Sequence, residues 1–228
     1  MENDNTPKPK FYTDYSYAEN SYVFILGPPG CGKGTLCTIA ADRLIGPLGQ
    51  PYSHLSVGDH LRKLCLIPEA VLDDDNLNTR ISRYREGDLE HADFYKICGD
   101  ILENRLIPSN VLVPLLEHEI FHGGPPETTW LVDGFPRSME NVLTFEQYNE
   151  KPERVIVIEC ERDVAEARYL ERGREPADDK ERFGRRYDQY FKNMEDIRKH
   201  YGDLIQTVRI PFAYCIWHGC VGKLPVPC

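Results

Sequence analysis

The sequence predicts an α/β protein with a doubly wound parallel sheet of about five strands and helices on both faces. Apolar runs of strand length recur along the 228 residues, and segments with helical spacing of apolar side chains separate them. A glycine-rich segment stands between the first apolar run and the first helical pattern, as in proteins that bind phosphate groups. The predicted strands are 22–26, 52–57, 128–133, 154–159 and 204–210, and the predicted helices are 33–45, 109–121, 161–172 and 182–201.

The first of these elements meet at a loop, Gly27-Pro28-Pro29-Gly30-Cys31-Gly32-Lys33-Gly34-Thr35. Its glycines allow backbone N–H groups to point at anionic oxygens, and the helix start adds partial positive charge. Lys33 can reach the terminal phosphates of a nucleotide. The hydroxyl of Thr35 follows Gly34 and so comes one residue later than in the general P-loop pattern. We therefore expect Gly30, Cys31, Gly32, Lys33, Gly34 and Thr35 to bind a nucleotide.

The third predicted strand ends in a second motif, Asp133-Gly134-Phe135-Pro136-Arg137. Ligands gather at the carboxyl ends of strands in open α/β sheets, so Asp133 could hold water or a metal ion beside a triphosphate. A strand-capping aspartate is the alternative. Arg137 follows on a rigid turn, and its guanidinium can bridge two phosphates.

The two motifs together resemble those of the nucleoside monophosphate kinases, the family of adenylate kinases and UMP/CMP kinases, over about 23–210. This resemblance implies an acceptor-binding region at about 56–108. Within it, Arg62 of Ser56-Val57-Gly58-Asp59-His60-Leu61-Arg62 would grip the monophosphate, although a solvated helix arginine is the alternative. The segment Arg105-Leu106-Ile107-Pro108 would fold over the acceptor nucleoside. The residues Gly134, Phe135, Pro136 and Arg137 would contact the acceptor as well.

Two positions bear on the acceptor base. Adenylate kinases usually carry glutamine four residues after the arginine of the second motif, whereas UMP/CMP kinases carry asparagine, and this chain has Asn141. An amide offers a donor and an acceptor to a base edge. Val57 stands where adenylate kinases often have threonine and the pyrimidine enzymes have alanine. Both positions favour CMP and UMP.

On the donor side, the resemblance implies that Arg172 contacts the donor nucleotide and that Arg186 clamps the transferring phosphate. Pro176 replaces an arginine of the family, for which Arg174 could substitute. No cysteine lies between Cys160 and Cys215, so we expect a short lid at about 173–181 without zinc, and no protein-held metal site.

The resemblance implies transfer of the γ-phosphoryl group of Mg-ATP to a nucleoside monophosphate, with Mg²⁺ held mainly by the nucleotide phosphates. Lys33, Asp133, Arg137 and Arg186 are the expected catalytic residues. AMP is the alternative acceptor. A nucleotide-binding protein with degenerate kinase activity is a second hypothesis, because Pro176 interrupts the lid motif. An ATPase or GTPase switch is disfavoured, since the second motif has no role there.

Composition bears on the expected partners, the redox state of the cysteines and the location of the protein. The net charge of −10 argues against nucleic acid or an acidic membrane as partner, and no apolar stretch is long enough to span a bilayer. Eight cysteines without a Cys-x-x-Cys pair favour reduced thiols, hence a cytoplasmic location with the nucleus as alternative. We expect a monomer that binds small nucleotides.

The chain around the predicted domain 22–210 is less regular. Residues 1–21 are polar and expected to form a flexible leader, and residues 211–228 form an atypical tail without helical periodicity. A mixed-charge insertion at about 64–93 interrupts the acceptor region. The last predicted helix carries an apolar stripe that we expect in the core, made of Phe183, Tyr187, Tyr190, Phe191, Met194, Ile197 and Tyr201.

Overall fold

The computed structural model describes residues 20–46, 49–66, 75–85, 89–102, 105–172 and 179–209. Five strands form one parallel sheet in the order β2-β3-β1-β4-β5, so the predicted fold class is confirmed. The predicted tail and nearly all of the predicted leader lie outside the described residues. The strands are β1 (Ser21–Leu26), β2 (Tyr52–Ser56), β3 (Thr129–Asp133), β4 (Arg154–Glu159) and β5 (Ile205–Arg209).

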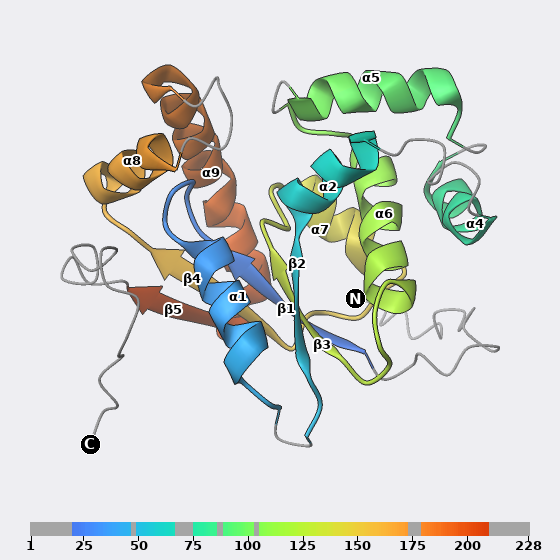
Figure 1. Ribbon diagram of the computed structural model, residues 1–228, viewed down its shortest axis with the longest axis horizontal. Coiled ribbons are helices and arrows are strands. Elements are labelled where there is room, and N and C mark those ends of the chain that lie inside the picture. The colour runs from blue at the N-terminus through green and yellow to red at the C-terminus, as the bar shows by residue number, and fades with distance from the viewer. Residues whose placement is uncertain are drawn as a thin grey trace, which may run out of the picture.

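Within the described ranges, the helices include the four that the sequence predicts and four more. The additional helices α2, α4, α5 and α7 follow β2 and β3, and α4 lies within the predicted insertion (Figure 1). A short 3₁₀ turn, Gly202–Leu204, precedes β5. The helices are α1 (Lys33–Arg43), α2 (Val57–Leu66), α4 (Asp75–Tyr84), α5 (His91–Leu102), α6 (Ser109–His122), α7 (Met139–Glu146), α8 (Arg162–Glu171) and α9 (Lys180–Tyr201).

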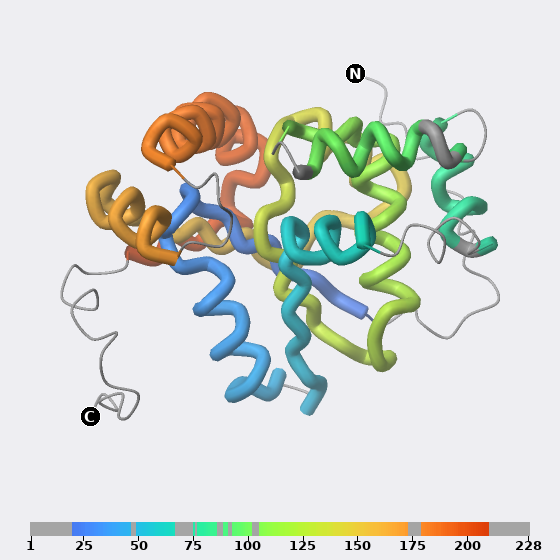
Figure 2. The backbone as a smooth tube through the Cα atoms, turned by 45° about the horizontal axis from the view of Figure 1, so that its top comes forward, coloured from blue at the N-terminus to red at the C-terminus, as the bar shows by residue number. Residues whose placement is uncertain are grey.

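The alternation of side chains along the central strand β1 divides the core between the two faces of the sheet. Phe24 points to the face covered by α6, α7 and α9, where its ring lies 5.3 Å from that of Phe135 and 5.6 Å from that of Phe145. Its neighbours Val23 and Ile25 point to the opposite face, where Cys37 of α1 packs on them. Figure 2 shows α1 and α9 on opposite sides of the sheet.

The apolar stripe of α9 is only partly a core element. Phe183, Met194, Ile197 and Tyr201 are buried, as the stripe predicts. Phe191, however, is 52% exposed, and its ring contacts that of Tyr187 in a tilted arrangement with centroids 4.8 Å apart. The apolar stripe therefore extends beyond the face of this 22-residue helix that packs on the rest of the protein.

A buried polar link attaches α4 to α6. The carboxylate of Glu117 on α6 is fully buried and accepts hydrogen bonds from Tyr84 Oη of α4 at 2.7 Å and from Asn149 Nδ2 at 2.5 Å. Arg80 of α4 is also buried, and its Nη1 lies 3.7 Å from Glu117 Oε2. Because a buried charge needs such partners, this link fixes α4 on the helix that supports the acceptor region.

Over the described residues, no helix is both long and apolar enough to cross a membrane. The cysteines in this part of the chain, Cys31, Cys37, Cys65, Cys98 and Cys160, are free thiols.

Candidate active site

The phosphate-binding loop joins β1 to α1 and ends at Gly32. This glycine has φ of +96°, a left-handed conformation that other residues adopt only with strain. No side chain caps α1, and the first N–H groups of an α-helix have no partner within the helix, so they are available to a phosphate. The Nζ of Lys33 donates to the carbonyl oxygens of Gly27 at 2.8 Å and Pro28 at 3.0 Å. A bound nucleotide would compete with these two carbonyls for the lysine.

Asp133 ends β3 directly beside the start of α1. Its side chain is largely buried, and its Oδ2 lies 3.4 Å from the place where a Cβ at Gly34 would stand. The Nε2 of His54, on β2, lies 3.7 Å from the same oxygen. The glycine after Lys33, which departs from the general P-loop pattern, therefore leaves space for the carboxylate of Asp133.

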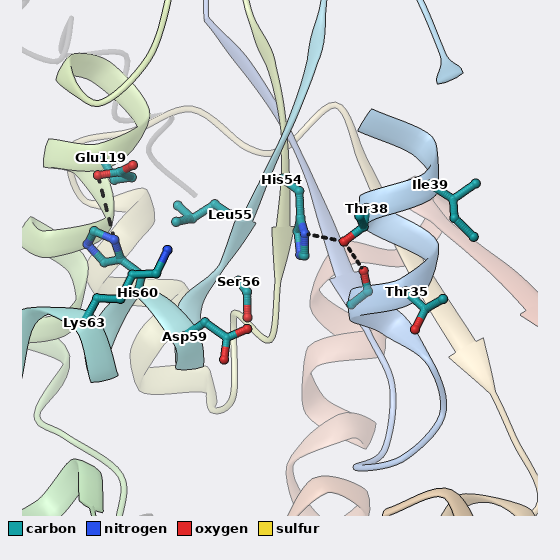
Figure 3. A pocket seen from close by; sticks show the side chains of 11 residues that line it. Thr35, Thr38, Ile39, His54, Leu55, Ser56, Asp59, His60, Lys63 and Glu119 are labelled. Carbon is teal, nitrogen blue, oxygen red and sulfur yellow. Dashed lines mark hydrogen bonds and ion pairs between the residues drawn. The ribbon is translucent and has the colours of Figure 1, made fainter. Parts of the chain in front are cut away.

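A cavity of about 480 Å³ opens between α1, β2 and α2 (Figure 3). Thr35 stands on one wall, and Ser56 and Asp59 stand on the other, so the cavity continues the phosphate-binding loop with oxygen-bearing side chains. At its far end His60 faces Glu119, with 3.8 Å between the ring nitrogen and the carboxylate. Burial lowers the pKa of His60 despite this carboxylate, so the ring is neutral at pH 7.

Three arginines from separate elements converge near the loop. Gly58 marks the gap between two of them, because a Cβ there would lie 3.4 Å from Nη2 of Arg62 and 3.8 Å from Nη2 of Arg137. Burial lowers the pKa of Arg137 to about 10, the charges of Arg186 and Arg62 lower it as well, and Asp133 opposes them. The guanidinium is still protonated at pH 7. Such a concentration of positive charge suits a ligand with several phosphate oxygens.

Hydrogen bonds hold the backbone and side chain of Arg137 in place. Its Nε donates to the carbonyl oxygen of Gly134 at 2.9 Å, and its own carbonyl oxygen accepts from Asn193 Nδ2 of α9 at 2.7 Å. Its backbone N–H donates to Oδ1 of Asn141 at 3.0 Å. Arg137 is thus fixed from the β3 turn, from α7 and from α9 at once.

Tyr169 of α8 joins two arginines on the other side of the loop. Its ring is buried, its Oη accepts from Nη1 of Arg186 at 3.4 Å, and the guanidinium of Arg172 lies 4.6 Å from the ring centroid. Cation–π contact of this kind orients a guanidinium without neutralising it. The two predicted donor-side arginines therefore lie on one aromatic platform.

The comparisons with known proteins agree with this geometry. A family model described as AAA domain matches residues 26–93, which contain the phosphate-binding loop. The chain is 30% identical to UMP-CMP kinase 3 of Arabidopsis thaliana over 186 residues, 81% of this chain and 71% of that protein. It is 30% identical to the UMP-CMP kinase of Lentinula edodes over 201 residues, 82% and 77% of the two chains. The chain belongs to the nucleoside monophosphate kinase family.

Relatives named as UMP-CMP kinases and relatives named as adenylate kinases have similar sequence identity to this nucleoside monophosphate kinase. Adenylate kinase 1 of Nostoc sp. is 28% identical over 185 residues, which cover 79% of this chain and 84% of that protein. The comparisons therefore give the family, and the acceptor has to be argued from the site.

Some of the predicted substrate-binding residues are buried in the core, some are exposed, and some lie outside the described residues. Phe135 belongs to the aromatic core, and Val57 is fully buried at the start of α2, so either would influence a substrate through packing. Arg105 is paired with Asp100 at 2.7 Å, and Leu106 beside it is exposed. Arg174 and the greater part of the predicted lid lie outside the described residues.

Several residues at the site have roles that the sequence did not predict. Asp59 forms an ion pair with Arg62. Its position inside the acceptor motif, three residues before this arginine, is the sequence feature that could have predicted the pair. The other residues carry no local signal, because each acts on a partner distant in sequence. These residues are His54 beside Asp133, Ser109 beside Asn141, and Asn193 beside Arg137.

Proposed function

We propose that this kinase transfers the γ-phosphoryl group of Mg-ATP to CMP or UMP and releases ADP and the nucleoside diphosphate. The convergence of Arg62, Arg137 and Arg186 beside the phosphate-binding loop is the observation that carries this proposal. Arg62 comes from the acceptor side, and Arg186 comes from the donor side. Arg137 stands between them, where a phosphoryl group passes from one nucleotide to the other.

Positive charge and alignment are what this reaction requires of the protein. The attacking atom is a phosphate oxygen that is already ionised, so no general base is needed. Lys33 and the N-terminus of α1 bind the donor phosphates, and Arg137 and Arg186 stabilise the charge on the transferring group. Arg137 needs little reorganisation for this role, because Gly134, Asn141 and Asn193 already hold it.

The site also suits a magnesium ion that arrives with ATP. Mg²⁺ prefers hard oxygen ligands and keeps several waters, and the carboxylate of Asp133 beside Gly34 can accept hydrogen bonds from such waters. Thr35 and Asp59 add oxygens on the walls of the adjoining cavity. The ion would neutralise charge on the β- and γ-phosphates.

The preference for a pyrimidine acceptor rests on Asn141. Its amide oxygen accepts from the backbone N–H of Arg137, which ties this side chain to the arginine trio, and the resemblance to the UMP/CMP kinases gives this position to the acceptor base. Asparagine is one methylene shorter than glutamine, so it leaves space next to the base and presents its amide closer to α7.

The test is an assay of ADP formation from ATP with CMP, UMP, dCMP, AMP or GMP as acceptor. We expect the highest kcat/KM with CMP or UMP. Arg137→Ala should lower kcat by about 10³-fold or more, because a single arginine at the transferring phosphate contributes that much. Arg154→Ala is the matched control, since Arg154 is an exposed arginine at the start of β4 and should leave kcat unchanged.

The outcomes separate the alternatives. Turnover with AMP alone would refute the pyrimidine acceptor while leaving phosphoryl transfer intact. Binding of ATP without any turnover that depends on an acceptor would refute the kinase activity itself and favour a nucleotide-binding role. Near-normal kcat in Arg137→Ala would show that the arginine roles are wrong.

A further inference from the structure

The amide of Asn141 is held on two sides by the protein. A backbone N–H can only donate, so the atom that Arg137 N contacts at 3.0 Å must be the amide oxygen. The amide nitrogen then points the other way and donates to the hydroxyl oxygen of Ser109 at 2.8 Å. Both side chains are buried, with Asn141 5% exposed and Ser109 2% exposed. The orientation of the amide therefore follows from the chemistry of its two partners.

We propose that Ser109 is a positioning residue that fixes the amide of Asn141 and thereby determines which acceptor base the enzyme prefers. This inference rests on the proposed function. Ser109 takes one of the two amide hydrogens and Arg137 takes one lone pair of the amide oxygen, so the amide keeps one N–H and one lone pair that these bonds do not use, and in this proposal the base edge pairs with them. A base that matches this fixed pair is selected, and a base that needs another orientation is rejected.

The location of Ser109 supports this role. It is the first residue of α6, whose first turns are buried, so its hydroxyl stands on a rigid element. It also follows directly after Ile107-Pro108, the end of the segment predicted to fold over the acceptor nucleoside. Ile107 is itself 7% exposed. One short stretch of chain therefore holds both the predicted cover of the acceptor and the partner of Asn141.

The energetic argument is the cost of a buried donor without an acceptor. Removal of the Ser109 hydroxyl leaves the amide nitrogen of Asn141 without this partner, and a buried unpaired donor is unfavourable. The side chain then turns toward any acceptor within reach, including an atom of the bound base. Fixed orientation is lost, and with it the difference in binding between pyrimidine and purine acceptors.

The experiment compares Ser109→Ala with Ser109→Thr, which keeps the hydroxyl. We measure kcat and KM for CMP, UMP and AMP at saturating ATP, and nucleotide Kd values by calorimetry. In Ser109→Ala, KM and Kd for the preferred acceptor should rise about three- to tenfold, the effect of one hydrogen bond. The ratio of kcat/KM between pyrimidine and AMP should fall by a similar factor, while KM for ATP stays unchanged. Ser109→Thr should retain most of the selectivity.

A double mutant tests whether Ser109 acts through Asn141. In an Asn141→Ala background, Ser109→Ala should have no further effect on selectivity. An equal loss for all acceptors, or an undiminished effect in that background, would overturn the inference. If the wild-type enzyme prefers AMP, the pyrimidine proposal fails, but Ser109→Ala must still change the AMP:CMP ratio of Kd values. Unchanged ratios would refute the role of Ser109 whatever the wild-type acceptor is.

Discussion

A single missing side chain determines how closely the phosphate-binding loop packs on its support. At Gly30, a Cβ would lie 1.9 Å from the carbonyl oxygen of Ala165 in α8, and the backbone φ is +79°. Backbone atoms inside a helix cannot move aside as a flexible side chain can. The loop and α8 are therefore in contact only because residue 30 is glycine.

Gly30→Ala should push the loop away from α8 and destabilise the fold by about 3 kcal/mol or more, from the clash and the strained φ together. Thermal unfolding and ATP binding measure this effect. Gly49→Ala is the matched control, because Gly49 has φ of +86° and, apart from its chain neighbours, no described residue has an atom within 4 Å of an added Cβ. It should lose only the ~1–2 kcal/mol that the left-handed conformation costs. Equal losses in the two variants would contradict the close packing of the loop.

At the scale of elements, the link between α4 and α6 depends on one buried carboxylate. Glu117→Ala would remove the carboxylate that faces the buried Arg80, and the loss of one partner of a buried ion pair typically costs about 3–5 kcal/mol. Tyr84→Phe would remove one hydrogen bond and should cost about 1 kcal/mol. Urea unfolding measures both, and hydrogen exchange in α4 should accelerate in Glu117→Ala.

Glu119→Ala is the control for this element, since Glu119 lies two residues away on the same helix. Its carboxylate is partly exposed and faces a histidine that is neutral at pH 7, so the change should cost less than about 1 kcal/mol. A loss as large as that of Glu117→Ala would mean that burial of the charge is not what makes the link strong.

For the whole molecule, stability should decline at alkaline pH because of the buried thiol of Cys37. Burial raises its pKa from an ordinary 9.0 to about 12, and the charge of Asp133 adds to this effect. Between these two values the unfolded chain has lost the proton and the folded chain keeps it. The contribution of this thiol to stability is therefore complete below pH 9 and is lost as the pH rises toward 12.

The comparison of wild type with Cys37→Ala isolates this contribution. Urea unfolding from pH 8 to pH 11 should show a steeper decline for the wild type, by up to about 1.4 kcal/mol per pH unit above pH 9. Parallel curves for the two proteins would show that Cys37 is not the titrating group.

The strands were predictable because buried parallel strands are continuous apolar runs, and each lies within one residue of its predicted bounds. Helix α4 was not predictable in the same way. Among its residues of described burial it buries Leu77, Arg80 and Ile81, and the buried Arg80 is paired with Glu117, which is 37 positions further along the chain. A periodic apolar pattern cannot report a partner of this kind.

The candidate site also contains residues that a local motif predicts and residues that depend on a partner distant in sequence. Lys33, Asp133 and Arg137 stand in motifs whose spacing already expresses their chemistry. Ser109 and Asn193 carry no such signal, because their partners Asn141 and Arg137 are separated from them by 32 and 56 positions. Contacts of this length exist only after the sheet has brought α6, α7 and α9 to one face.

The central position of β1 in the sheet has a consequence for how this enzyme can change over time. Everything proposed for the acceptor lies between β2 and α7, on one side of β1, and everything proposed for the lid lies after β4, on the other. The acceptor residues and the lid are thus carried by separate stretches of the chain, and the phosphate-binding loop precedes both. A recombination that joins two homologues between α7 and β4 would therefore exchange the lid as a unit and keep the phosphate-binding loop and the acceptor residues of one parent together.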